Sequence, residues 1–153
     1  MQEKQNTALV WFRNDLRVVD NQSLYDATTK HDKVIGLVLI PAEWLAESSL
    51  GFKKMEAFRA RFLLESIADL QRDLESHHIP LIVKIDDGTS LTQICSQYQI
   101  TDIYLQKEWT KEEIEQEKGI PESVAVHKSY NQFLFHPDDL PIPIKELPEI
   151  FTV

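Results

Sequence analysis

Five short apolar runs, separated by stretches with helical spacing, constrain the fold of this chain more than any other feature. The runs are near-continuous in Val, Ile and Leu, and they span residues 8–12, 34–40, 81–85, 102–105 and 124–126. Such runs are typical of strands that are buried on both faces of a parallel sheet. Strands and helices therefore alternate along the chain, which predicts an α/β fold: a doubly wound, Rossmann-like sheet of five parallel strands with helices on both faces.

Helical spacing is clearest over residues 54–77. Large apolar residues recur there mostly three or four positions apart, which predicts one buried stripe made up of Met55, Phe58, Phe62, Leu63, Ile67, Leu70 and Leu74. Two segments, beginning at Ser90 and Thr110, fit a capping box and mark two further helix starts. Asp20 is the expected N-cap of a short helix over residues 21–29.

Composition and charge exclude several classes of protein. The chain has 153 residues, about one domain, and no apolar run approaches the roughly 18 residues that a membrane span needs. Its net charge of −9 argues against a grip on a phosphate backbone by this chain alone. The N-terminus is polar and Cys95 is the only cysteine, so we expect a cytoplasmic protein with a buried, inert thiol. The four glycines form no phosphate-cradling loop.

The pattern of strands and helices stops after residue 126. Prolines then recur at 137, 141, 143 and 148, and proline removes backbone donors and fixes φ. We therefore divide the chain into an α/β domain, residues 1–128, and an extended proline-rich linker, residues 129–153. Because the linker ends in apolar residues, we expect the chain to be a fragment of a longer protein.

A dense ionic loop follows the first predicted strand. Arg13, Asp15, Arg17 and Asp20 place two positive and two negative charges within eight residues. Ligands bind at the carboxyl ends of the strands in open parallel sheets, so this loop is a candidate wall of a ligand cleft. The alternative is structural: arginine–carboxylate forks hold the loop and cap the first helix. The two interpretations are compatible.

A second candidate site follows the fourth predicted strand. Glu108 can accept two N–H bonds from a heterocycle, and Trp109 can stack on it. The alternative is that Glu108 is a solvated carboxylate and Trp109 a partly buried core residue. Trp44, after the second strand, either lines a cleft or packs over the edge of the sheet.

Three segments together resemble the photolyase and cryptochrome family. Residues 11–24 read W-F-R-N-D-L-R-x-x-D-N-x-x-L, which is similar to the opening of that family, and residues 59–70 resemble its R-x-x-F-L-x-E-S-L-x-D-L helix. Residues 136–152 are similar to the H-P-D-D-L-P-F-x-I-x-x-L-P-x-x-F-T segment of the DASH-type cryptochromes, with Ile142 in place of the phenylalanine. The resemblance extends from about residue 7 to residue 153.

The resemblance implies an N-terminal α/β domain that precedes a larger helical domain. In that family the helical domain holds FAD and binds DNA, and members repair pyrimidine dimers by light-driven electron transfer or act as blue-light receptors. The α/β domain helps to hold an antenna chromophore, commonly methenyltetrahydrofolate and in other members a deazaflavin, in the cleft between domains. We therefore expect the C-terminal FAD-binding domain as partner, damaged DNA contacted only through it, and no repair activity in this chain alone.

The same resemblance assigns roles to particular residues. Glu108 matches the acidic position of the family's Q-x-E-x-T/N motif and is the expected pterin contact, with Glu112 as a second candidate nearby. Trp109 stands where that motif usually has a small or aliphatic residue. The residues of the opening motif are carried over as structural or interdomain residues: Arg13, Asp15, Arg17, Asp20 and Asn21. The remaining alternatives are a stand-alone nucleotide-binding α/β domain and a non-catalytic interaction domain that docks through residues 129–153.

Overall fold

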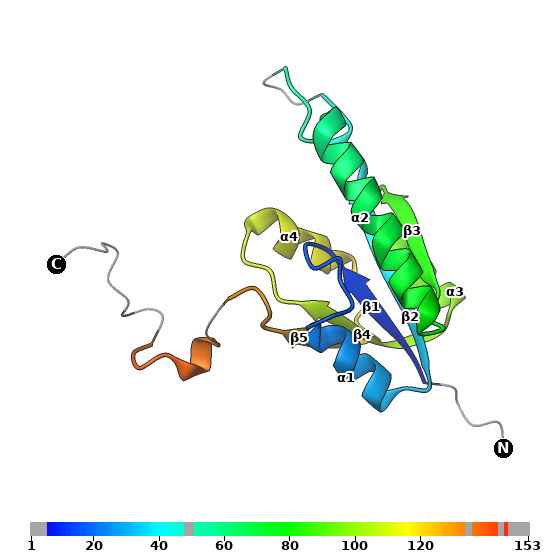
Figure 1. Cartoon of the computed structure of the whole chain (residues 1–153), viewed down its shortest axis with the longest axis vertical. Helices are drawn as coiled ribbons and strands as arrows, with labels where there is room; N and C mark the ends of the chain where they lie inside the picture. The colour runs from blue at the N-terminus through cyan, green and yellow to red at the C-terminus, as the bar shows by residue number, and fades with distance from the viewer. Residues whose placement is uncertain (1–5, 48–50, 134–135, 144–145, 147–153) are drawn as a thin grey trace.

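A five-stranded, all-parallel sheet forms the centre of the molecule (Figure 1). The computed structural model describes residues 6–47, 51–133, 136–143 and 146, so the end of the predicted linker lies outside the described residues. The strand order is β3-β2-β1-β4-β5, so the chain reverses direction across the sheet after β3, and β1 lies beside β4. The strands are β1 (Thr7–Phe12), β2 (Lys33–Pro41), β3 (Leu81–Asp86), β4 (Ile100–Gln106) and β5 (Ala125–Ser129). This order confirms the predicted doubly wound sheet.

Helices cover both faces of the sheet, as the sequence predicts. The first core cluster joins α1 and α2 to one face, where Val10, Phe12 and Val38 are buried. The second joins α3 to the opposite face through Leu91 and Ile94. The helices are α1 (Gln22–Lys30), α2 (Ala57–Ser76), α3 (Ser90–Gln97) and α4 (Lys111–Gln116), with short 3₁₀ turns η1 (Ala42–Trp44), η2 (Glu117–Gly119) and η3 (Pro137–Asp139).

The expectation that all strands are buried on both faces holds only for the centre of the sheet. Every residue of β1 is buried, because β2 and β4 flank it and helices cover it. At the edges, however, Val83 and Ile85 of β3 and Val126 of β5 are exposed. Apolar content alone does not separate an edge strand from a central one.

The predicted stripe of α2 is only partly right. Ile67, Leu70 and Leu74 are buried against the sheet, and Met55 just before the helix is buried too. The prediction is wrong for Phe58 and Phe62, whose side chains are exposed. At about 100° per residue, Phe58 lies half a turn away from Ile67, since nine residues separate them. The apolar residues spaced three and four positions apart therefore shift gradually around the helix and do not all lie on one buried face.

The N-cap of α1 is Asn21 and not Asp20. The Asn21 side chain accepts a hydrogen bond from the Leu24 amide at 3.0 Å. Asp20 adopts a left-handed conformation with φ of 51°, in which its backbone carbonyl accepts hydrogen bonds from the side chains of Arg17 and Asn131. The aspartate therefore shapes the turn before the helix, and the next residue caps it.

The two predicted capping boxes differ in outcome. Thr110 is the N-cap of α4, and its hydroxyl accepts from the Glu113 amide at 3.5 Å and donates to the Glu113 carboxylate at 2.8 Å. In α3, Ser90 is the first helical residue and its amide donates to Asp86 Oδ1 at 3.1 Å. The start of α3 was thus predicted correctly, but the group that caps it belongs to the end of β3.

Candidate functional site

Arg13, which follows β1 directly, connects the end of β1 to β4 and to the segment that follows β4. Its side chain is largely buried; Nη2 donates to the Gln106 carbonyl at 2.5 Å and pairs with Glu117 Oε1 at 3.1 Å. Nη1 donates to the Glu113 carbonyl at 3.3 Å. The guanidinium therefore fastens the end of β1 to β4, α4 and η2. Both terminal nitrogens donate within the chain, which favours the structural interpretation for this residue, whereas the buried Nε has no hydrogen-bond partner among the described residues.

The loop after β1 is held by a buried aspartate–asparagine pair. Asp15 accepts from the Arg13 amide at 3.0 Å and from Asn21 Nδ2 at 3.2 Å, and both Asp15 and Asn21 are buried. Arg17 is exposed, and its guanidinium donates to the carbonyl of Asp20 at 3.2 Å. The expected arginine–carboxylate forks within the loop are therefore absent from this described segment. An amide–carboxylate pair holds it instead.

Glu108 is a buried carboxylate at the end of β4, with 3% of its surface exposed. One oxygen accepts from Gln106 Nε2 at 3.3 Å, and the other accepts from Gln132 Nε2 at 2.5 Å. Burial raises the pKa of Glu108 above that of an ordinary glutamate. The side-chain oxygen of Gln106 is buried too, without a hydrogen-bond partner in the part of the chain that is described. Glu108 is thus not a solvated carboxylate, and each of its two oxygens already accepts a hydrogen bond from a glutamine side chain.

Trp109 belongs to an exposed aromatic cluster and not to the core. Its ring centroid lies 6.0 Å from that of Tyr130 and 5.4 Å from that of Phe133. The Lys107 ammonium lies 4.7 Å from the centroids of both Trp109 and Tyr130 and donates to the Tyr130 hydroxyl. The segment after β5 therefore packs back against the residues that follow β4. Trp44 is half-buried against the α1–α2 core, with the Arg59 guanidinium over its ring.

A cleft of about 1010 Å³ opens at the carboxyl ends of β2 and β3. One wall is the connection after β2, which includes η1; another is the turn after β3; and the third is α4 with η2. We call it the carboxyl-end cleft. Its charged lining is mainly acidic, with six carboxylates and three lysines: Glu43, Glu47, Asp86, Asp87, Glu112 and Glu115, and Lys54, Lys111 and Lys118. Acidic and basic groups thus surround an open space at the carboxyl edge of the sheet, beside β2 and β3 and not directly at the β1/β4 switch point.

Glu112 faces the carboxyl-end cleft, whereas Glu108 and Trp109 do not line it. Glu112 Oε1 accepts a hydrogen bond from Lys54 Nζ at 2.8 Å, and this bond raises the pKa of Lys54. The structure therefore separates the three candidate cofactor residues instead of bringing them into one pocket. Sequence reasoning missed Lys54 and Asp87, although Asp87 lies two residues after a predicted strand and so carried a positional signal.

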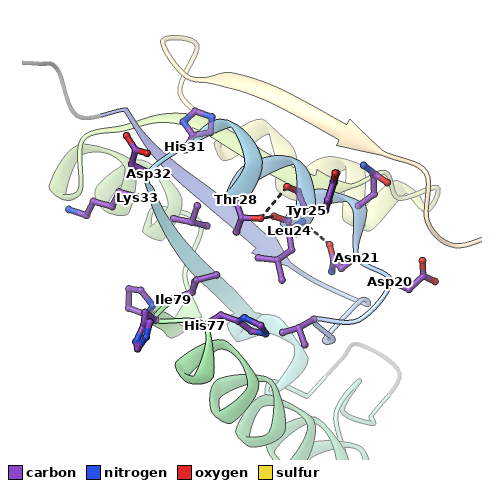
Figure 2. Close-up of a pocket in the computed structure, with 15 residues that line it drawn as sticks. Asp20, Asn21, Leu24, Tyr25, Thr28, His31, Asp32, Lys33, His77 and Ile79 are labelled. Atoms are coloured by element: carbon purple, nitrogen blue, oxygen red, sulfur yellow. Dashed lines mark hydrogen bonds between the residues drawn. The ribbon is translucent and has the colours of Figure 1, made fainter.

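A second cavity of about 880 Å³ lies between α1 and the C-terminal end of α2. Figure 2 shows Tyr25, Thr28 and His31 on one side of this groove and His77 and Ile79 on the other. It lies mainly over the amino end of β2, away from the carboxyl-end cleft. Within the described residues, no three His, Cys, Asp or Glu side chains are grouped as a metal site requires, and none of the helices is long and apolar enough to cross a membrane.

The reversed strand order and the carboxyl-end cleft define a doubly wound α/β domain with an open cleft at the ends of two of its strands. Residues 8–153 match the DNA photolyase family, and the chain belongs to that family. The predicted resemblance is thereby confirmed.

Named relatives agree with this assignment. A cryptochrome DASH of Gloeobacter violaceus is 38% identical over 95% of this chain, and the blue-light photoreceptor PHR2 of Arabidopsis thaliana is 33% identical over 92%. A solved cryptochrome structure from Synechocystis superimposes with a TM-score of 0.89 at 29% identity over 99% of this chain. The match spans 30%, 33% and 32% of those proteins, respectively, so this chain has about a third of their length.

Proposed function

We propose that this chain is the antenna-binding and structural domain of a DASH-type cryptochrome or photolyase, and that a folate antenna, methenyltetrahydrofolate, binds in the carboxyl-end cleft. One observation carries the proposal: the cleft has about 1010 Å³ at the functional edge of the sheet, enough for a cofactor of this size. We propose further that the parent holds FAD and contacts damaged DNA through a separate C-terminal domain, and that it is cytoplasmic.

The charges of the cleft fit the chemistry of the ligand. The methenyl bridge of the cofactor is cationic and its pterin ring carries N–H donors, so carboxylates such as Glu112 and Asp87 suit it. The glutamate tail of the cofactor is anionic and matches Lys111, whereas Lys118 already pairs with Glu115 at 2.7 Å. When bound, the folate would supply light absorption and pass excitation onward. The residues of this chain bind and orient it.

Glu108 is the second candidate for the pterin contact. A heterocycle that bonded Glu108 would have to replace Gln132, which donates to Oε2 at 2.5 Å. The unpartnered oxygen of Gln106 lies beside that carboxylate and could accept one further donor. The two candidate positions therefore predict different responses to substitution.

An absorbance titration with methenyltetrahydrofolate tests the proposal. Wild type is compared with Glu112→Gln, with Glu108→Gln and with Glu122→Gln, an exposed control outside the cleft. We expect a saturable, red-shifted band that Glu112→Gln weakens at least severalfold and Glu122→Gln leaves unchanged. If only Glu108→Gln weakened the band, the antenna site would lie at the end of β4 and not in the carboxyl-end cleft. A wild-type chain that responds to ATP and not to folate would support the nucleotide-binding alternative instead.

A further inference from the structure

The first eight residues of α2 are apolar on all sides of the helix. Of residues 57–64, only Arg59 and Arg61 are polar. Leu63 faces the core, but Phe58, Phe62 and Leu64 are 91%, 72% and 60% exposed. We call these three side chains the α2 patch.

A helix that is apolar all round is normally buried, whereas one that lies on a surface has a single apolar face. The remaining twelve residues of α2 have the second pattern, with Ile67, Leu70 and Leu74 buried and the other side charged. The first eight residues of α2 can thus be compared with the remaining twelve residues of the same helix. Figure 1 shows that the N-terminal turns of α2, next to the β2–α2 connection, project beyond the sheet.

The two arginines of this segment leave the patch open. Arg59 turns back to the domain, where its guanidinium lies 4.8 Å from the Trp44 ring centroid and donates to the Lys54 carbonyl at 3.0 Å. Arg61 pairs with Glu65 at 2.8 Å in an exposed i,i+4 bridge, which is a weak interaction in water. The guanidinium of Arg61 is therefore available at the rim of the apolar surface.

We propose that the α2 patch is the docking surface for the second domain of the parent protein. This inference rests on the proposed two-domain parent and names the part of this chain that the second domain covers. Two observations point to that occupant: relatives continue for about twice the length of this domain, and the patch projects from the same end of the sheet as the carboxyl-end cleft. The matching surface is apolar, with an acidic side chain opposite Arg61.

The solved Synechocystis cryptochrome gives the first test. The exposure of its residues aligned with positions 58, 62 and 64 is measured with and without the two thirds of that chain outside the match. We expect these residues to be exposed in the matched third alone and buried in the whole protein. Continued exposure in the whole protein would overturn the proposal.

A chimera gives the test on this chain. This chain replaces the matched third of the Synechocystis cryptochrome, and the double variant Phe58→Ser/Phe62→Ser is compared with Tyr25→Ser, which removes a 65% exposed aromatic from α1. We expect the double variant to lower the midpoint of thermal unfolding by several degrees and to release FAD at least severalfold faster. The control should change neither. Equal behaviour of the two variants would overturn the proposal.

Thermal unfolding of the isolated chain distinguishes an effect of the substitutions on domain docking from an effect on folding. Because the two phenylalanines are exposed, the double variant should unfold at the same temperature as the wild type when no second domain is present. If the isolated chain self-associates and the double variant abolishes only that association, the occupant is a second copy and the proposal is wrong. Folate titration remains an independent readout, so failure of antenna binding and failure of docking are distinguishable.

Discussion

Two arginines of one short motif have different environments, and this difference is testable at the scale of single residues. The Arg13 side chain is largely buried against Glu117 and the Gln106 carbonyl, whereas Arg17 is exposed. Arg13→Ala would leave Glu117 paired with Lys128 but would remove the donor to the carbonyls of Gln106 and Glu113. We expect it to lower the free energy of unfolding by roughly 1–3 kcal/mol. Arg17→Ala should change it by less than about 0.5 kcal/mol. Urea unfolding of both variants measures this, and equal effects would contradict the described network.

Glu108 predicts a pH dependence of stability with a defined sign. Burial raises its pKa in the folded state above 4.5, so the folded chain holds this proton more tightly than the unfolded chain does. The stabilising contribution is fully present below pH 4.5 and is lost as the pH rises through the raised pKa. Wild type should therefore lose stability relative to Glu108→Gln over that interval. Urea unfolding at several pH values checks this, and a relative gain of stability would contradict it.

The limits of sequence reasoning are clearest at these residues. The position of Glu108 at the end of a strand was predictable, but its burial was not, because Gln132 reaches it from 24 residues further along the chain. Likewise, both Asp20 and Asn21 are good N-cap residues by type. Only the backbone conformation decides between them.

At the scale of elements, side chains of α2 and β3 pack closely around Gly36 of β2. A Cβ at Gly36 would lie 3.0 Å from Leu81 Cδ1 and 3.1 Å from Leu74 Cδ1. We expect Gly36→Ala to destabilise the chain by about 1–3 kcal/mol because of overpacking. Gly119→Ala, where the nearest atom is 4.0 Å away, is the matched control. Thermal unfolding compares them, and a neutral Gly36→Ala would show that the helix can move away.

The elements themselves were largely predictable from their patterns. All five strands overlap the predicted apolar runs, although β5 (Ala125–Ser129) extends three residues beyond the run at 124–126. The exposed side of α2 was not predictable, since three- and four-residue spacings allow Phe58 and Phe62 to be counted into the buried stripe. A search for helical segments that are apolar all round would have singled out residues 57–64.

At the scale of the whole molecule, the carboxyl-end cleft, the α2 patch and the α1–α2 groove are separate surface features. The carboxyl-end cleft and the α2 patch lie toward the carboxyl ends of the strands, and the α1–α2 groove lies mainly over the amino end of β2. The acidic net charge of −9 is consistent with the proposal that the parent contacts DNA through a separate domain. The family was recognisable from the opening motif. The cleft could not be predicted from the sequence, because three connections that are far apart in the chain form it.

Mapping of methenyltetrahydrofolate binding by amide chemical shifts in the ¹⁵N-labelled chain tests the central claim most directly. The account predicts saturable shifts at residues 87–88 and 111–112, which line the carboxyl-end cleft, and none at residues 28–31 in the α1–α2 groove. Shifts confined to the groove, or none anywhere in the chain at millimolar ligand, would contradict it.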